Sequence, residues 1–181
     1  MNFEDFIVAP RQFRTEKWQI GNKITSEIKE NSIVLLFVSD YRGANGDAES
    51  QDFTGIRREF YKLSQLDFDI PIIDLGDLVS GKTPQDSHYI LQEVLSVCHQ
   101  KGAIPVIVGG SNDLAFSLFS ALNYHQQDIN YTQISNVVSL KQDEEIHEST
   151  FLSKILGSKN FSVKNYHPLG YQKHLHDSDS V

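Results

Sequence analysis

Apolar runs of strand length alternate along this chain with amphipathic stretches of helical period, and this alternation restricts the fold more than any other feature. The apolar runs cover residues 32–38, 68–75, 103–110 and 134–140, and the helical stretches cover residues 56–66, 84–101, 113–122 and 149–157. Continuous apolar runs predict strands buried on both faces of a parallel sheet. Helices between such strands form right-handed crossovers. We therefore expect an α/β fold with three layers, α/β/α, around a mainly parallel sheet.

The carboxyl ends of the predicted strands are the expected place for a site, because the loops of such a sheet gather there. The stretches to search therefore follow Val38, Leu75, Val108 and Leu140. The longest of them, residues 39–55, is polar, and a loop of that length in a compact domain is often functional.

Composition narrows the class of protein. The chain has 181 residues and a formal net charge of −8, which suits one domain and argues against a nucleic-acid surface. The acidic start is unlike a signal peptide, and the longest apolar run, residues 33–38, is too short to span a bilayer. Cys98 is the only cysteine, so an internal disulfide is excluded, and its apolar neighbours predict burial. We expect a cytoplasmic protein without a nucleic-acid or membrane partner.

A glycine pair ends the third apolar run. Gly109 and Gly110 are followed by Ser111, which can cap the next helix. A tight strand-to-helix turn explains the pair by itself, since glycine lets the backbone turn sharply. A phosphate loop is the weaker interpretation, because neither a dinucleotide-type glycine triplet nor a Lys-Ser/Thr pair is present.

The chain around the glycine pair resembles the ureohydrolases, the family of arginase, agmatinase and formimidoylglutamase, and is closest to the formimidoylglutamase branch. The resemblance runs over about residues 30–175 and rests on residues 103–122 (family signature Gly-Gly-x-His), 72–78 (Asp-x-Gly), 40–63 (a long loop leading to Ile56 and Arg57) and 151–175 (a Ser-rich helix and an Asn-Tyr strand). It implies the arginase fold, assembly into oligomers, and two Mn²⁺ ions that activate a water for attack on an amidine carbon.

Several positions depart from the family pattern. Asn112 replaces the histidine ligand of the first motif. In the second motif, Asp-Ala-His-x-Asp, Lys141 falls on the first aspartate, Asp143 on the histidine and Glu145 on the last aspartate. A protonated lysine offers no lone pair and repels a dication. The third motif of the family would lie downstream of Val181.

A metal site at these positions is one of two interpretations. Asn112, Asp143 and Glu145 are the family-equivalent ligands and supply oxygen atoms that suit a hard cation, with His147 nearby. Alternatively, residues 141–145 form a solvated charged turn. We expect no cofactor, and Mn²⁺ if a metal site is retained. His174 and His176 lie in a polar tail, residues 173–181, that we expect to be flexible.

The resemblance leads to an expected domain organisation and three hypotheses of function. We expect one ureohydrolase-like domain over residues 1–181, truncated relative to the family, with an N-terminal arm at residues 1–25, and self-association through apolar surface left exposed. First, the protein has lost the binuclear metal site and catalysis, a pseudoenzyme that serves as a binding or interaction module. Second, it is a Mn²⁺-dependent hydrolase of linear C–N (amidine) bonds in truncated form. Third, it is an unrelated α/β protein that binds a small ligand. We expect no catalytic residue, and the sequence leaves the substrate or ligand unknown.

Overall fold

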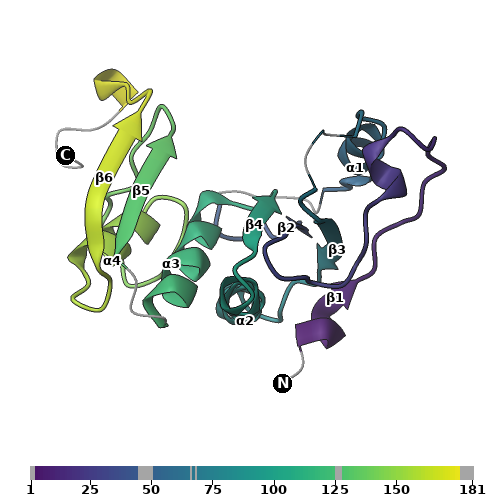
Figure 1. Ribbon diagram of the computed structural model, residues 1–181. Coiled ribbons are helices and arrows are strands. Elements are labelled where there is room, and N and C mark those ends of the chain that lie inside the picture. Colours follow the sequence, from purple (N-terminus) through teal and green to yellow (C-terminus); the bar gives the residue numbers. More distant parts are fainter. Residues whose placement is uncertain (1–2, 45–50, 66, 68, 125–127, 176–181) are drawn as a thin grey trace. The chain divides into compact units, whose positions relative to one another are not determined.

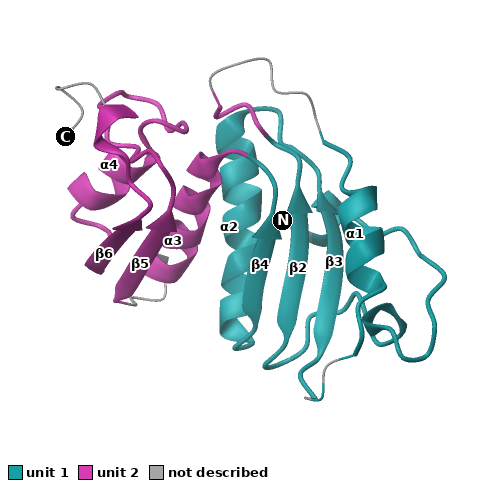
Figure 2. Ribbon diagram, turned by 90° about the horizontal axis from the view of Figure 1, so that it is seen from above, with its two compact units in different colours: residues 1–40, 49–110 teal, residues 41–48, 111–181 magenta. Residues whose placement is uncertain are grey.

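The computed structural model describes residues 3–44, 51–65, 67, 69–124 and 128–175. The chain divides into two compact units, residues 1–40 with 49–110 and residues 41–48 with 111–181 (Figure 2). We call them unit 1 and unit 2. No helix in the described part of the chain is long and apolar enough to cross a membrane.

Unit 1 is built on a four-stranded sheet of order β1-β3-β2-β4. Its elements are the 3-10 helices η1 (Phe3–Phe6) and η2 (Ile20–Asn22), the strands β1 (Ile7–Val8), β2 (Ile33–Val38), β3 (Ile72–Leu78) and β4 (Ile104–Val108), and the helices α1 (Thr54–Tyr61) and α2 (Pro84–Gln100). Strand β2 runs parallel to β3 and β4, while the short β1 is antiparallel to β3. Helices α1 and α2 lie on opposite faces of this sheet (Figure 1). Unit 1 therefore has the expected three layers.

Strand β2 supplies side chains to both layers. Leu35 and Phe37 pack with Phe53 and Phe60 on the α1 side. The alternate residues of β2 are also buried, and so is the apolar stripe of α2, which includes Leu91 and Val94. A strand buried on both faces is what the continuous apolar run predicts.

Helix α2 begins and ends as the sequence predicts. The hydroxyl of Thr83 accepts a hydrogen bond from the Asp86 amide, and the Asp86 carboxylate accepts one from the Thr83 amide. Together these bonds form a capping box, with Pro84 at the first helical position. Gly102, at φ +62°, follows the end of the helix. Cys98 is buried within it, as expected.

Strand β4 differs from the expectation that it is buried on both faces. It lies at the edge of the sheet among the described strands, and Ile104 is 63% exposed and Val106 39% exposed. The Ile104 amide donates to the Ser32 carbonyl, toward β2. The backbone N–H groups of successive residues in a strand point to opposite sides. The backbone nitrogen of Pro105 therefore faces the outer edge, where its missing N–H costs no hydrogen bond to β2. An apolar run alone does not separate such an edge strand from a central one.

The glycine pair after β4 makes the tight turn expected from the sequence. Gly109 and Gly110 have φ of +91° and +76°, a region that L side chains rarely adopt. A β-carbon built on Gly109 would lie 2.1 Å from Cζ of Phe53 and 2.7 Å from the Val38 carbonyl oxygen. The turn thus needs glycine for its conformation and for its close packing.

A buried ionic network joins β3 to α1. Nε of Arg57 lies 2.7 Å from Oδ2 of Asp74, and its Nη1 lies 2.9 Å from Oδ2 of Asp77. The Tyr61 hydroxyl donates to the same Asp74 oxygen, and the guanidinium carbon lies 4.0 Å from the ring centroid of Phe37. The register of β3 against β2 shifts beside Asp74, as at a β-bulge, which commonly re-aims a side chain.

Unit 2 has a two-stranded parallel sheet and one apolar core. Its elements are η3 (Asn112–Leu114), α3 (Ala115–Tyr124), β5 (Ile129–Ile134), α4 (Phe151–Gly157), β6 (Val163–Leu169) and η4 (Lys173–Leu175). The core cluster contains Phe119 of α3, Ile129 of β5, and Phe151, Leu152 and Ile155 of α4. Tyr131 and Tyr166 pack against it and stack on each other across the strands, with ring centroids 5.5 Å apart.

The predicted strand at residues 134–140 is wrong. The strand lies earlier, at Ile129–Ile134, and alternates buried and exposed residues. Residues 135–150 instead form an irregular loop. The hydroxyl of Ser135 accepts a hydrogen bond from the Val137 amide, and such local side-chain bonds compete with a strand ladder.

Candidate functional site

A pocket of about 250 Å³ opens in unit 2, where the irregular loop passes η3 and η4. Its lining residues are Asn112, Ser135, Asn136, Val137, Val138, Ser139, Lys141, Glu148, Ser149 and Leu175. Most of these side chains carry a hydroxyl, an amide or a charge. We call this hollow the loop pocket.

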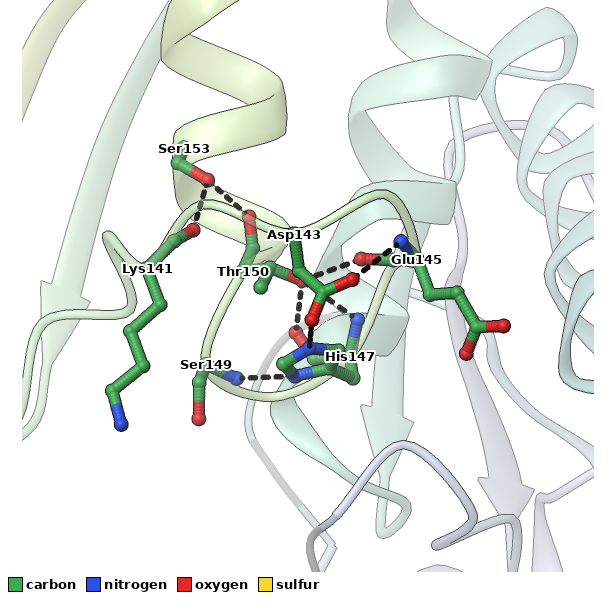
Figure 3. Close-up of polar contacts among 7 residues, drawn as sticks. All are labelled: Lys141, Asp143, Glu145, His147, Ser149, Thr150 and Ser153. Atoms are coloured by element: carbon green, nitrogen blue, oxygen red, sulfur yellow. Dashed lines mark hydrogen bonds and ion pairs between the residues drawn. The ribbon is translucent and has the colours of Figure 1, made fainter.

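Helix α4 fixes the shape of the loop through two side chains at its N-terminal end. The Thr150 hydroxyl donates to the Glu145 carbonyl at 2.8 Å and accepts from the His147 amide at 3.0 Å. The Ser153 hydroxyl donates to the Lys141 carbonyl at 2.7 Å. Thr150 is fully buried. The polar side chains at the start of α4 therefore replace the ladder hydrogen bonds that a strand would have given this segment (Figure 3).

Asn112 and Lys141 both line the loop pocket. The sequence places them 29 residues apart and does not say whether they meet in one cavity. Both are exposed at the pocket surface. The Lys141 ammonium makes no ion pair with a described residue. The two residues that the sequence resemblance assigns to ligand positions therefore contribute an ammonium and an amide to the same hollow.

Asp143 and Glu145 do not line this pocket. One Asp143 oxygen accepts a hydrogen bond from the Glu145 amide at 3.3 Å, and the other lies 3.7 Å from Nε2 of His147. The backbone amides of Glu145 and Glu144, and then His147, hold the pKa of Asp143 below its ordinary value. Asp143 is 56% exposed. Lys141 and Glu145 extend to opposite sides of Asp143 (Figure 3).

The three family-equivalent positions are thus divided between the loop pocket and the outer side of the loop. Asn112 lies in the pocket, while Asp143 and Glu145 belong to an exposed turn. Within the described residues, no three histidine, cysteine, aspartate or glutamate side chains are grouped as a metal site. The metal site at Asn112, Asp143 and Glu145 stays a prediction from the sequence. Of the histidine tail, His174 lies in η4, while His176 and the residues after it lie outside the described part of the chain.

Of the residues that line the loop pocket, sequence reasoning singled out only Asn112 and Lys141; Ser139 and Glu148 are among those that it missed. Ser139 is only 6% exposed, and it is a polar residue within a run predicted to be an apolar strand. Glu148 is half-buried, and its amide donates to the Gly43 carbonyl at 2.8 Å. The polar residues Ser135, Asn136 and Ser139 inside the run were the available signal, because a strand buried on both faces rarely carries three.

A second hollow of about 250 Å³ adjoins the loop pocket. Asn112 and Ser135 line both hollows. Beyond them the second hollow is lined by Ala115 of α3, by Tyr131 and other residues of β5, and by Phe151 of α4. Burial raises the pKa of Tyr131 to about 12, so its hydroxyl stays protonated at neutral pH. Among the described residues, the lining of the second hollow contains two aromatic side chains, Tyr131 and Phe151, whereas the lining of the loop pocket contains none.

Solved structures resemble this chain in fold. Formimidoylglutamase from Bacillus subtilis matches with a TM-score of 0.75 and 16% identity, over 95% of this chain and 58% of that one. An asparagine-to-histidine variant of Trypanosoma cruzi formiminoglutamase with Mn²⁺ matches with a TM-score of 0.70 and 16% identity, over 80% and 53%. Proclavaminate amidino hydrolase from Streptomyces clavuligerus gives 0.70 and 14%, over 88% and 59%.

The chain has the arginase fold. The predicted α/β class and the expected architecture are confirmed by this likeness. The arginase-fold chain spans less than two thirds of the length of each of the three structures. No protein-family model and no curated protein matches its sequence.

Proposed function

We propose that this arginase-fold protein binds a small polar ligand in the loop pocket and does not catalyse metal-dependent hydrolysis. One observation carries the proposal: Lys141 and Asn112, which the sequence resemblance aligns with metal ligands, line the same pocket. An ammonium beside a dication is repulsive, at about 4 kcal/mol for each unit of cation charge at 4 Å near a protein surface. The pocket therefore favours an anionic group where the ureohydrolases hold a cation.

A thermal melt in Mn²⁺ and in a chelator tests this proposal. A ligand that binds only the folded state stabilises it by about 2.7 kcal/mol at a hundredfold excess over Kd. We expect equal melting temperatures in the two conditions, and no release of urea or formamide from amidine substrates. A Mn²⁺-dependent rise that Asp143→Ala abolishes would contradict the proposal. Glu144→Ala, in the same exposed turn, is the matched control.

The second candidate function is a Mn²⁺-dependent amidinohydrolase of the formimidoylglutamase or arginase type. The likeness in fold to the T. cruzi formiminoglutamase favours it. That enzyme carries an asparagine that was replaced by histidine in a structure with Mn²⁺. Under this candidate the Asn112 carbonyl oxygen is a neutral metal ligand, and Asn112→His should strengthen Mn²⁺ binding. The metal-free proposal instead expects Asn112→His to leave the Mn²⁺ response absent while Lys141 remains.

The hypothesis of an α/β protein with a different sheet is not retained, because the fold is the arginase fold. A small-ligand role, which that hypothesis also contained, is carried by the loop pocket itself.

A further inference from the structure

The loop pocket contains two opposite charges that do not neutralise each other. Lys141 and Glu148 both line it. Neither side chain forms an ion pair or a hydrogen bond with another described residue, so the ammonium and the carboxylate are more than 4 Å apart. The backbone around them is fixed by the Glu148 amide bond to Gly43 and the Lys141 amide bond to the Ser149 carbonyl. The two charged side chains therefore project from separate, fixed backbone positions into one hollow.

Neutral groups in the lining of the same pocket also have unused hydrogen-bonding capacity. The Ser139 hydroxyl can donate and accept, and Ser139 is 94% buried. The amides of Asn112 and Asn136 line the same pocket. Within the described chain, none of these three side chains makes a hydrogen bond. These groups are therefore available to hydrogen-bond a polar ligand that enters the pocket.

We infer that the loop pocket takes a small zwitterion, with the anionic group of the ligand at Lys141 and its cationic group at Glu148. This inference rests on the proposed function and names the ligand class for the same pocket. A ligand with a single charge leaves one of the two protein charges unpaired. A compound whose only charged group is a guanidinium or amidine cation is also repelled by the Lys141 ammonium. The pocket therefore discriminates by the ligand's pair of charges.

A series of ω-amino acids measures this preference. Glycine, β-alanine, 4-aminobutyrate and 6-aminohexanoate carry the same two charges at increasing separation. Butyrate, butylamine and agmatine carry one sign only. Titration calorimetry on the full chain should show a best length in the amino-acid series, bound at least about tenfold more tightly than butyrate or butylamine. Agmatine should bind no better than butylamine.

Two charge-removing variants assign the ends of the ligand. Lys141→Met should abolish the advantage of the best amino acid over butylamine, and Glu148→Gln should abolish its advantage over butyrate. Lys164→Met and Glu144→Gln, at exposed positions outside the pocket lining, are the controls and should leave binding unchanged. Melting temperature in the absence of ligand shows that each variant is folded.

Several outcomes overturn the inference, and they are separable from failure of the proposed function. Equal binding of amino acids, butyrate and butylamine would show a polar pocket without charge pairing, and the proposed function would stand. Binding that neither charge variant alters would place the ligand elsewhere. Absence of binding by every ω-amino acid also overturns the inference. The metal-free part of the proposed function fails separately, if Mn²⁺ stabilises the chain through Asp143 or if amidine hydrolysis is detected.

Discussion

Arg57 donates from Nε to Oδ2 of Asp74 across 2.7 Å, and neither side chain is exposed by more than 3%. Removing one partner of a buried pair leaves the other charge without compensation. Because Asp74 also accepts from the Tyr61 hydroxyl and the Gly76 amide, its carboxylate is held in place by several groups. Its charge is compensated mainly by Arg57.

We predict that Arg57→Ala lowers the free energy of unfolding by about 3–5 kcal/mol. Chemical denaturation measures this change. Arg58→Ala is the control, because Arg58 is 55% exposed and its contact with Glu59 is a surface pair worth at most about 1 kcal/mol. Similar losses in the two variants would show that the buried pair contributes little to stability.

Gly109 and Gly55 should respond in opposite directions to substitution by alanine. In Gly109→Ala, the positive φ alone costs about 1–3 kcal/mol, and the new methyl also meets Phe53 and Val38. In Gly55→Ala, nothing lies within 4 Å of the new methyl, and alanine favours α1 by about 0.5–1 kcal/mol. Melting temperatures of the two variants provide the comparison. An unchanged melt for Gly109→Ala would mean that the turn relaxes freely.

Stability should fall at alkaline pH through Cys98. Burial raises the pKa of its thiol to about 11, from an ordinary value of 9.0. The unfolded chain ionises first as pH rises, so the stabilisation is complete below about pH 9 and is lost between about pH 9 and 11. The loss is about 2–3 kcal/mol. Denaturation of wild type and Cys98→Ala across this range isolates it, because the tyrosine contributions cancel in the difference. Parallel pH profiles for the two proteins would contradict the prediction.

Thr150→Val should loosen the loop that forms the pocket. The substitution keeps the shape of the buried side chain and removes its hydrogen bonds to the Glu145 carbonyl and the His147 amide. We expect a loss of about 1–3 kcal/mol, since these backbone groups lose their partner. Thr150→Ser retains the hydroxyl and should recover most of the loss. Faster hydrogen exchange at the His147 amide in Thr150→Val, but not in Thr150→Ser, would assign the effect to the loop.

Sequence reasoning located well those helices and strands whose residue pattern lies entirely within the element itself. Residues 32–38 and 84–101 correspond closely to β2 and α2, because a continuous apolar run or a capped amphipathic stretch is sufficient to specify each. Strand β5 was missed because its pattern is half polar and its partner β6 begins about thirty residues later. The pairing of two distant segments is not visible in either one alone.

The candidate site was predicted only in part for the same reason. The resemblance selected Asn112, Asp143 and Glu145 by their order along the chain. The loop that carries the last two is shaped by Thr150 and Ser153, and these bonds bring Lys141 and Glu148 to the pocket while Asp143 turns outward. Motif spacing assumes a strand end, and an irregular loop does not preserve that spacing.

Pro105, at the outer edge of β4, has a consequence for the behaviour of the chain in crowded solution. Apart from its proline, the run Ile104–Val108 is uncharged and rich in branched residues, a composition that favours pairing with further strands at an exposed edge. Fibril growth requires an unbroken row of backbone donors for the incoming strand. Proline interrupts that row at the second of five residues, so β4 can serve as the rim of a sheet without recruiting further chains.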